Sequence, residues 1–182
     1  SIEFSDAQPY YSTNEVEWFY DSDEEVFTLM CVVDMIRRIS KNSRIDLWIP
    51  YLPNARMDRI KEEKQNFSLK VFANFINSLN FDRVMTYNVH SNVSEALIDK
   101  VVNIDPIFDV DAVISDYKPD VIYFPDEGAC KRYVDLDSVK KSGLPVIFGI
   151  KKRDFATGKI LGLDVISDTD LTGKKVLIVD DI

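Results

Sequence analysis

Two adjacent carboxylates, Asp180 and Asp181, follow the apolar run Val176-Leu-Ile-Val179 near the end of the sequence. An uninterrupted apolar run of this kind is typical of a strand that is buried on both faces of a parallel sheet. Because open α/β sheets bind ligands at the carboxyl ends of their strands, the two carboxylates are candidates for contact with a polyhydroxylated or phosphorylated ligand. An ordinary strand followed by an acidic loop would give the same pattern, so the pair alone leaves both interpretations open.

Charged side chains and the single histidine follow the other predicted strands, over 44–49, 83–87, 120–124 and 146–150. Sites of phosphoryl transfer need such a mixture, because carboxylates hold Mg²⁺ while Arg and Lys offset charge on the moving phosphate. The sequence therefore predicts a magnesium-dependent phosphoryl-transfer site, built from residues that follow these strands in chain order: Arg56, Asp58 and Arg59; His90; Asp126, Lys131 and Arg132; Lys151 and Arg153.

Each of these residues also has a purely structural interpretation. A lone histidine such as His90 is more often a structural residue than a ligand. Asp126 stands one residue before Glu127-Gly128, which is consistent with turn chemistry. Lys151 and its basic neighbours could be a solvated cluster. Their shared position after predicted strands favours the functional interpretation, because independent surface charges have no reason to collect there.

The positioning elements alternate along the chain. Apolar residues recur at helical spacing within 21–38, 67–79 and 107–115, and a further helix is predicted near 131–141. Strands alternating with helices predict an α/β fold with mainly parallel sheets covered by helices on both faces. The segment Asn103-Ile-Asp-Pro106 is the best candidate for a domain junction.

Composition narrows the function classes. With 182 residues, of which 46% are hydrophobic, the chain can bury a full core. A net charge of −9 argues against a nucleic-acid partner, since a phosphate backbone requires a basic footprint. No apolar run is long enough to span a bilayer. The two cysteines, Cys31 and Cys130, lack a metal or redox spacing, which favours reduced thiols in a cytoplasmic protein.

Segments in order along nearly the whole chain resemble the ribose-phosphate pyrophosphokinase family, the PRPP synthetases. Any one of these segments is a weak signal, whereas their shared order is a strong one. The segments, in chain order, are Phe4-Ser-Asp6-Ala-Gln8, Pro53-Asn-Ala-Arg56-Met57-Asp58-Arg59, Ser68-Leu-Lys-Val-Phe-Ala-Asn-Phe-Ile-Asn-Ser78, Val89-His90-Ser91, Phe124-Pro-Asp126-Glu-Gly128 with Lys131-Arg132, Ile150-Lys151-Lys-Arg153 and Val179-Asp180-Asp181.

The resemblance implies two phosphoribosyltransferase-like, doubly wound α/β domains with mainly parallel sheets, over residues 1–105 and 106–182. The start of the first domain would be missing and the second would be incomplete, so a fragment is expected, with activity that requires residues beyond this chain. The family also implies a homo-oligomer, either a dimer or a hexamer.

The resemblance further implies the reaction: the diphosphate of MgATP passes to the anomeric hydroxyl of ribose 5-phosphate, giving PRPP and AMP for nucleotide and NAD biosynthesis. The implied roles of the matching residues follow the family's motifs. The catalytic residues would be Lys151 and Arg153, and Mg²⁺ would be held near His90 and Asp126. Ribose 5-phosphate would be bound by Asp126, Asp180 and Asp181, and ATP by Phe4, Asp6, Gln8, Arg56, Met57, Asp58 and His90.

The chain departs from the family pattern at Met57, where Gln is expected, and at Asn88, where Asp is expected. Gln8 stands for Glu, and Ala129 stands for a second Gly. These departures keep a second interpretation open, a catalytically silent homologue that regulates or scaffolds a true synthetase. A third is a type I phosphoribosyltransferase, which consumes PRPP and shares the apolar strand followed by two Asp residues.

Overall fold

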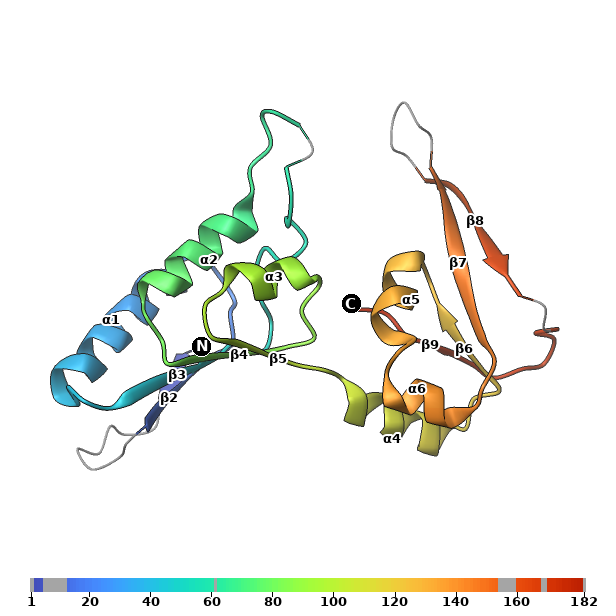
Figure 1. Ribbon diagram of the computed structural model, residues 1–182, viewed down its shortest axis with the longest axis horizontal. Coiled ribbons are helices and arrows are strands. Elements are labelled where there is room, and N and C mark those ends of the chain that lie inside the picture. Colours follow the sequence, from blue (N-terminus) through green and yellow to red (C-terminus); the bar gives the residue numbers. More distant parts are fainter. Residues whose placement is uncertain (1, 5–12, 61, 154–159, 168–169, 182) are drawn as a thin grey trace. The chain divides into compact units, whose positions relative to one another are not determined.

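The computed structural model describes residues 2–4, 13–60, 62–153, 160–167 and 170–181, and its contacts divide the chain into two compact units, Ser1–Asp105 and Pro106–Ile182 (Figure 1). Each unit is built around one sheet with helices packed on it. The α/β fold with mainly parallel sheets predicted from the alternation is confirmed. Among the described residues, no helix is long and apolar enough to cross a membrane.

The first unit contains a sheet in the order β1-β2-β3-β4-β5, in which only β1 runs antiparallel to its neighbour. Its described helices lie together on one face of this sheet (Figure 1), where the alternation predicted helices on both faces. The strand order explains this, because each right-handed crossover steps to the next strand along. The elements are β1 (Ile2–Phe4), β2 (Thr13–Trp18), α1 (Glu25–Ile39), β3 (Arg44–Trp48), α2 (Ser68–Ser78), β4 (Arg83–Tyr87), α3 (Asn92–Leu97) and β5 (Val101–Ile104).

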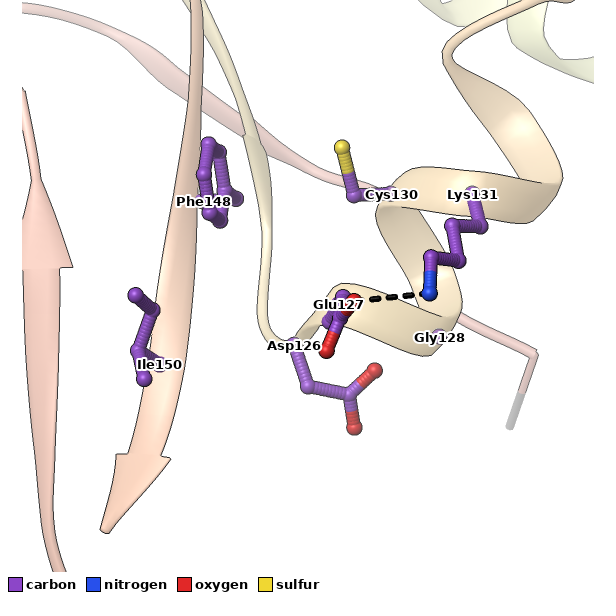
Figure 2. Close-up of a pocket in the computed structure, with 7 residues that line it drawn as sticks. All are labelled: Asp126, Glu127, Gly128, Cys130, Lys131, Phe148 and Ile150. Atoms are coloured by element: carbon purple, nitrogen blue, oxygen red, sulfur yellow. Dashed lines mark ion pairs between the residues drawn. The ribbon is translucent and has the colours of Figure 1, made fainter.

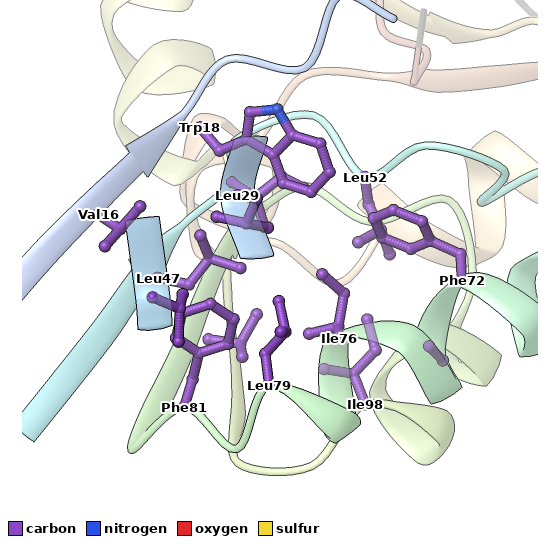
Figure 3. Packing of buried hydrophobic residues seen from close by; sticks show 14 of the residues in the cluster. Val16, Trp18, Leu29, Leu47, Leu52, Phe72, Ile76, Leu79, Phe81 and Ile98 are labelled. Atoms are coloured by element: carbon purple, nitrogen blue, oxygen red, sulfur yellow. The ribbon is translucent and has the colours of Figure 1, made fainter. Parts of the chain in front are cut away.

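The core of the first unit lies between this sheet and its helices (Figure 3). Helix α1 buries Leu29, Val33 and Ile36 at helical spacing, while α2 contributes Leu69 and Ile76 among others. Trp18 at the end of β2 is fully buried and packs near Phe72, with ring centroids 6.0 Å apart. Burial of this apolar face fixes β3 and β4 side by side, so their carboxyl ends lie at one edge of the sheet.

The second unit contains a sheet in the order β8-β7-β6-β9, with β6, β7 and β9 parallel and β8 antiparallel to β7. Its core gathers residues of the three helices over Ile122 and Phe124 of β6, one of the two inner strands. The elements are α4 (Ile107–Tyr117), β6 (Val121–Phe124), α5 (Glu127–Tyr133), α6 (Asp137–Ser142), β7 (Val146–Arg153), β8 (Ile160–Ile166) and β9 (Val176–Ile178).

Several elements differ from the sequence predictions. The helix predicted near 131–141 is two short helices, α5 and α6, because α5 begins at the Asp126 cap and ends before Asp135. Strand β7 continues to Arg153 through antiparallel pairing with β8, so the segment compared with a mobile catalytic loop has strand backbone at Lys151 and Arg153. Pairing with β8, the next strand along the chain, overrode the expected end at Ile150.

Strand β2 was not predicted, because its inward positions include a polar residue. The side chains of Asn14, Val16 and Trp18 point into the unit. The first of these inward positions is polar, which breaks the alternation of apolar and polar residues expected of a strand. The Asn14 amide donates a hydrogen bond to the Ser43 hydroxyl (Nδ2 to Oγ 2.6 Å), which satisfies a polar group that is 7% exposed.

Candidate functional site

In the first unit, the loop after β3 carries the residues predicted to bind ATP. Asn54 adopts φ 61°, in the left-handed region that Asn tolerates better than most residues, and its carbonyl accepts a hydrogen bond from the Met57 backbone N–H at 2.9 Å. This turn leaves Arg56 and Met57 exposed to solvent. Arg56 is therefore available to an anionic ligand, whereas Met57 offers an apolar surface in place of the expected amide.

Asp58 turns inward and holds its neighbour Arg59. The carboxylate is buried and accepts two hydrogen bonds from the Arg59 guanidinium, at 2.7 Å from Nε and 3.0 Å from Nη2. Arg59 lowers the pKa of Asp58, and Ser91 and His90 add to this effect. Asp58 is thus committed to fixing the guanidinium plane of Arg59, which remains largely exposed. This contact was not foreseen, although the adjacency of the two residues was its signal in sequence.

The end of β4 supplies the histidine. Asn88 adopts φ 47°, and its backbone N–H donates to the Ile104 carbonyl at 2.9 Å. The Val89 N–H donates to Asn103 Oδ1 at 3.2 Å, so β5 supports the segment on which His90 stands. The half-buried His90 lies near enough to Asp58 to help lower its pKa. The structure therefore brings the β3 loop and the β4 end together, as parallel neighbouring strands require.

In the second unit, Asp126 caps helix α5. Its carboxylate accepts a hydrogen bond from the Ala129 backbone N–H (2.9 Å), which satisfies one of the donors left unpaired at a helix start. A Cβ on Gly128 would lie 3.1 Å from Asp126 Oδ1, so this glycine leaves room for the cap. Ala129 is buried in the core, which explains a methyl group where the family pattern has glycine.

The acidic pair after β9 is held by a basic residue of α5. Arg132 Nη1 lies 2.9 Å from Asp181 Oδ2, and the two side chains are only 22% and 11% exposed. Arg132 also donates to the Tyr133 hydroxyl at 3.3 Å and lies 5.4 Å from that ring's centroid. Burial opposes the charge of Arg132, but its contacts with Asp181 and Tyr133 outweigh it and raise the pKa of Arg132. Asp180 accepts a hydrogen bond from the Asp181 N–H at 2.9 Å.

A hollow of about 670 Å³ opens beside Asp126, between α5 and β7 (Figure 2). Phe148 and Ile150 of β7 form its apolar wall, and Lys131 lies on the helix side. Lys131 pairs with Glu127 at 2.7 Å, and this contact raises the pKa of Lys131. The hollow thus joins an apolar surface to a carboxylate and an ion pair at the carboxyl end of β6.

The remaining predicted residues are placed only in part. Asp6 and Gln8 lie outside the described residues. Phe4 ends β1, and Lys151 and Arg153 belong to the last part of β7, with their backbones alone described. The structure therefore brings together Asp58 with His90 in one unit, and Asp181 with Arg132 in the other.

For a metal, the described part of the chain contains no group of three or more His, Cys, Asp or Glu side chains that could form a cage. Mg²⁺ in phosphoryl-transfer sites is usually bound through one or two carboxylates together with substrate phosphates and waters. His90, in the first unit, and Asp126, in the second, are each a single candidate contact of that kind.

Comparisons with known proteins were made by sequence and by structure. The chain is 30% identical over 167 residues to the ribose-phosphate pyrophosphokinase of Cereibacter sphaeroides, covering 88% of this chain and 48% of that protein. It is 29% identical over 167 residues to the enzyme of the same name from Campylobacter jejuni, covering 51% of that protein. The chain thus spans about half the length of the curated relatives it matches. No protein-family model matches it.

Among solved structures, phosphoribosylpyrophosphate synthetase from Mycobacterium smegmatis matches with a TM-score of 0.72 at 20% identity, covering 91% of this chain and 53% of that one. The fold defines the class: an α/β protein with mainly parallel sheets whose charged residues follow the carboxyl ends of the strands. Within that class, the chain is a divergent relative of the ribose-phosphate pyrophosphokinase family.

Proposed function

We propose that the protein containing this chain transfers the diphosphate of MgATP to the anomeric hydroxyl of ribose 5-phosphate, giving PRPP and AMP. One observation carries the proposal: the similarity to ribose-phosphate pyrophosphokinases extends over 88% of the chain. In the reaction, the anomeric oxygen bonds to the β-phosphorus while the bond from that phosphorus to the α-phosphate oxygen breaks. The hydroxyl loses its proton, and AMP leaves.

The chain's own residues would act mainly by charge and position. Arg56 and the Asp58-bound Arg59 would hold the triphosphate, since a planar guanidinium matches phosphate geometry. Lys151 and Arg153 would offset the negative charge that develops around the β-phosphate. Phe4, Asp6 and Gln8 remain proposed contacts of the nucleotide, by resemblance alone.

A Mg²⁺ bound with the nucleotide would help to neutralise the negative charge of the phosphates. His90 and Asp126 are its proposed protein contacts, each standing at the carboxyl end of a strand. Asp126 already accepts one backbone hydrogen bond, which orients its carboxylate and leaves acceptor capacity on its oxygens. Asp126 would also contact ribose 5-phosphate, together with the acidic pair after β9.

Further parts of the proposal follow from the family. We expect a cytoplasmic, homo-oligomeric protein, either a dimer or a hexamer, that binds neither nucleic acid nor membrane. The reaction would serve nucleotide and NAD biosynthesis.

The direct test is to incubate the protein with MgATP and ribose 5-phosphate and to quantify AMP and PRPP by chromatography. The proposal expects the two products in equal amounts. Lys151→Ala should abolish turnover and leave ATP affinity within about a few fold, because its contact belongs to the transition state.

Other results would identify a different function. No AMP above background, with ATP binding intact, would indicate a catalytically silent homologue. Consumption of PRPP in the presence of a nucleobase would indicate a phosphoribosyltransferase.

A further inference from the structure

The two acids after β9, Asp180 and Asp181, are adjacent in the sequence but lie in different environments. Asp181 is 11% exposed and paired with Arg132 at 2.9 Å. Asp180 is half-buried, and the hydrogen bond described for its carboxylate comes from the next residue's backbone. The pair is therefore asymmetric before any ligand arrives.

Arg132 is itself fixed on several sides. It projects from α5, lies over the Tyr133 ring and donates to the hydroxyl of that residue, and Tyr133 is 1% exposed in the core. Because the Arg132 side chain is only 22% exposed, its position depends on the packed helix rather than on solvent. The ion pair between Arg132 and Asp181, which is largely shielded from solvent, thus connects helix α5 to the segment after β9.

The ion pair between Arg132 and Asp181 also affects the neighbouring carboxylate of Asp180. Two neighbouring carboxylates repel each other, and neutralising one of them with a guanidinium lowers the cost of keeping the other ionised. The Asp181 N–H points at Asp180 Oδ1, so a shift of Asp181 would also move the acceptor beside it. Arg132 therefore holds Asp181 in place and, through the Asp181 backbone N–H, influences the orientation of the Asp180 carboxylate.

We propose that the acidic pair divides its roles: Asp181 is a positioning residue clamped by Arg132, and Asp180 is the carboxylate that accepts the sugar hydroxyls. The inference rests on the proposed function and deepens it, because the resemblance alone assigns both acids to the ribose equally. It also gives Arg132, a charged residue of the predicted site to which no role was assigned, the role of a second positioning residue.

The test is calorimetric titration of the protein with ribose 5-phosphate in the presence of Mg²⁺, paired with urea denaturation of the same variants. The variants are Asp180→Asn, Asp181→Asn, Arg132→Gln, Arg132→Lys and the double variant Arg132→Gln/Asp181→Asn. Lys141→Gln is the matched control, since it removes a cation from an exposed ion pair of the same unit, with Asp137 at 2.8 Å.

Asp180→Asn should weaken sugar-phosphate binding about tenfold or more, the scale of a lost hydrogen bond to a charged group, with an unchanged urea midpoint. Arg132→Gln and Asp181→Asn should each lower both the affinity and the urea midpoint, because each leaves a buried charge without its partner. The double variant should lose less than the two single losses combined. Arg132→Lys should recover part of the affinity, and Lys141→Gln should match the wild type.

Three results would overturn the inference. Asp181→Asn could weaken binding as much as Asp180→Asn while leaving the urea midpoint unchanged, which would make Asp181 a direct ligand. If the losses of affinity and stability in the double variant equalled the sum of the two single losses, Arg132 and Asp181 would not be coupled. Absence of ribose 5-phosphate binding by the wild type would defeat the proposed function and the role of Asp180, and the denaturation series would then show separately whether Arg132 and Asp181 are coupled.

Discussion

Single residues in this chain owe their properties to one or two close contacts. Glu25, in the first turn of α1, accepts hydrogen bonds from the Trp18 indole (2.9 Å) and from the Asp21 backbone (3.1 Å). These contacts lower the pKa of Glu25 to about 2. They tie the end of β2 to the start of the following helix, close to the carboxyl edge of the first sheet.

This depressed pKa predicts how acid affects the first unit. The folded pKa is below the unfolded value of about 4.3, so the stabilisation is complete above that value and is lost as the pH falls toward 2. Glu25→Gln should therefore flatten the loss of stability between about pH 5 and about pH 2.5. Urea midpoints followed by tryptophan fluorescence measure this, and Trp18 and Trp48 both lie in the first unit.

Glu24→Gln removes the same charge one residue earlier and is the control for that experiment. An identical pH dependence in the wild type and in Glu25→Gln would contradict the prediction.

Asp126 illustrates how one carboxylate can have a structural and a functional role. As the cap of α5 it should tolerate Asn, which also accepts the Ala129 hydrogen bond. Asp126→Ala should lower the free energy of unfolding by about 1 kcal/mol, whereas Asp126→Asn should change it by a few tenths at most. Both variants should lose sugar-phosphate affinity in calorimetric titrations. Full binding by Asp126→Asn would show that only the cap matters.

At the scale of elements, β7 carries a glycine that the turn after β6 requires. A Cβ on Gly149 would lie 2.6 Å from the Pro125 carbonyl oxygen and 2.8 Å from the Tyr123 hydroxyl. Backbone cannot yield as a flexible side chain can, so the close approach of these two strands depends on the missing side chain. The approach in turn places Asp126 beside the hollow on the α5 side of β7.

Gly149→Ala should therefore destabilise the second unit by about 1–3 kcal/mol, the usual cost of overpacking. Gly162→Ala in the paired strand β8 is a matched control, since a Cβ there meets nothing within 4 Å and should cost less than about 0.5 kcal/mol. Hydrogen exchange of the β6 and β7 amides would report the loss in the correct unit. Equal effects of the two substitutions would refute the steric explanation.

At the scale of the whole molecule, the net negative charge predicts which partners the chain does not bind. The chain carries −9 at pH 7, with a calculated pI near 4.6. Duplex DNA repels such a surface unless a local basic patch compensates. The chain should thus pass unretained through a duplex-DNA column at about 0.15 M salt. Retention that weakens steeply with added salt would reveal a basic footprint and contradict the expectation.

Each of the two compact units has a core of its own, so stability and site geometry are set within each unit. In the first unit, the core aligns the ends of β3 and β4 and thereby places Asp58 near His90. In the second, it aligns β6 with β9 and places Arg132 beside Asp181.

Much of the fold was predictable because periodicity and turn chemistry are local. The helices over 25–39 and 68–78 were recognisable from apolar residues at helical spacing, and β6 and β9 from uninterrupted apolar runs. Strand β2 was not, because Asn14 occupies an inward position and is satisfied only by Ser43, a residue far along the chain. The extension of β7 to Arg153 was missed for a different reason, because it depends on antiparallel pairing with β8 rather than on local composition.

By itself, the sequence determined most of the α/β alternation and that charged residues follow strands such as β3, β6 and β9, because neighbouring residues encode both. It could not show that Asp58 is bound to Arg59, that Asp126 caps α5, or that only one acid of the terminal pair faces Arg132. Only the tertiary structure decided these roles. The strength of a carboxylate's contacts depends on burial and on partners that folding brings within hydrogen-bond distance. Arg132 and Asp181 are such partners, although α6, β7, β8 and β9 lie between them along the chain.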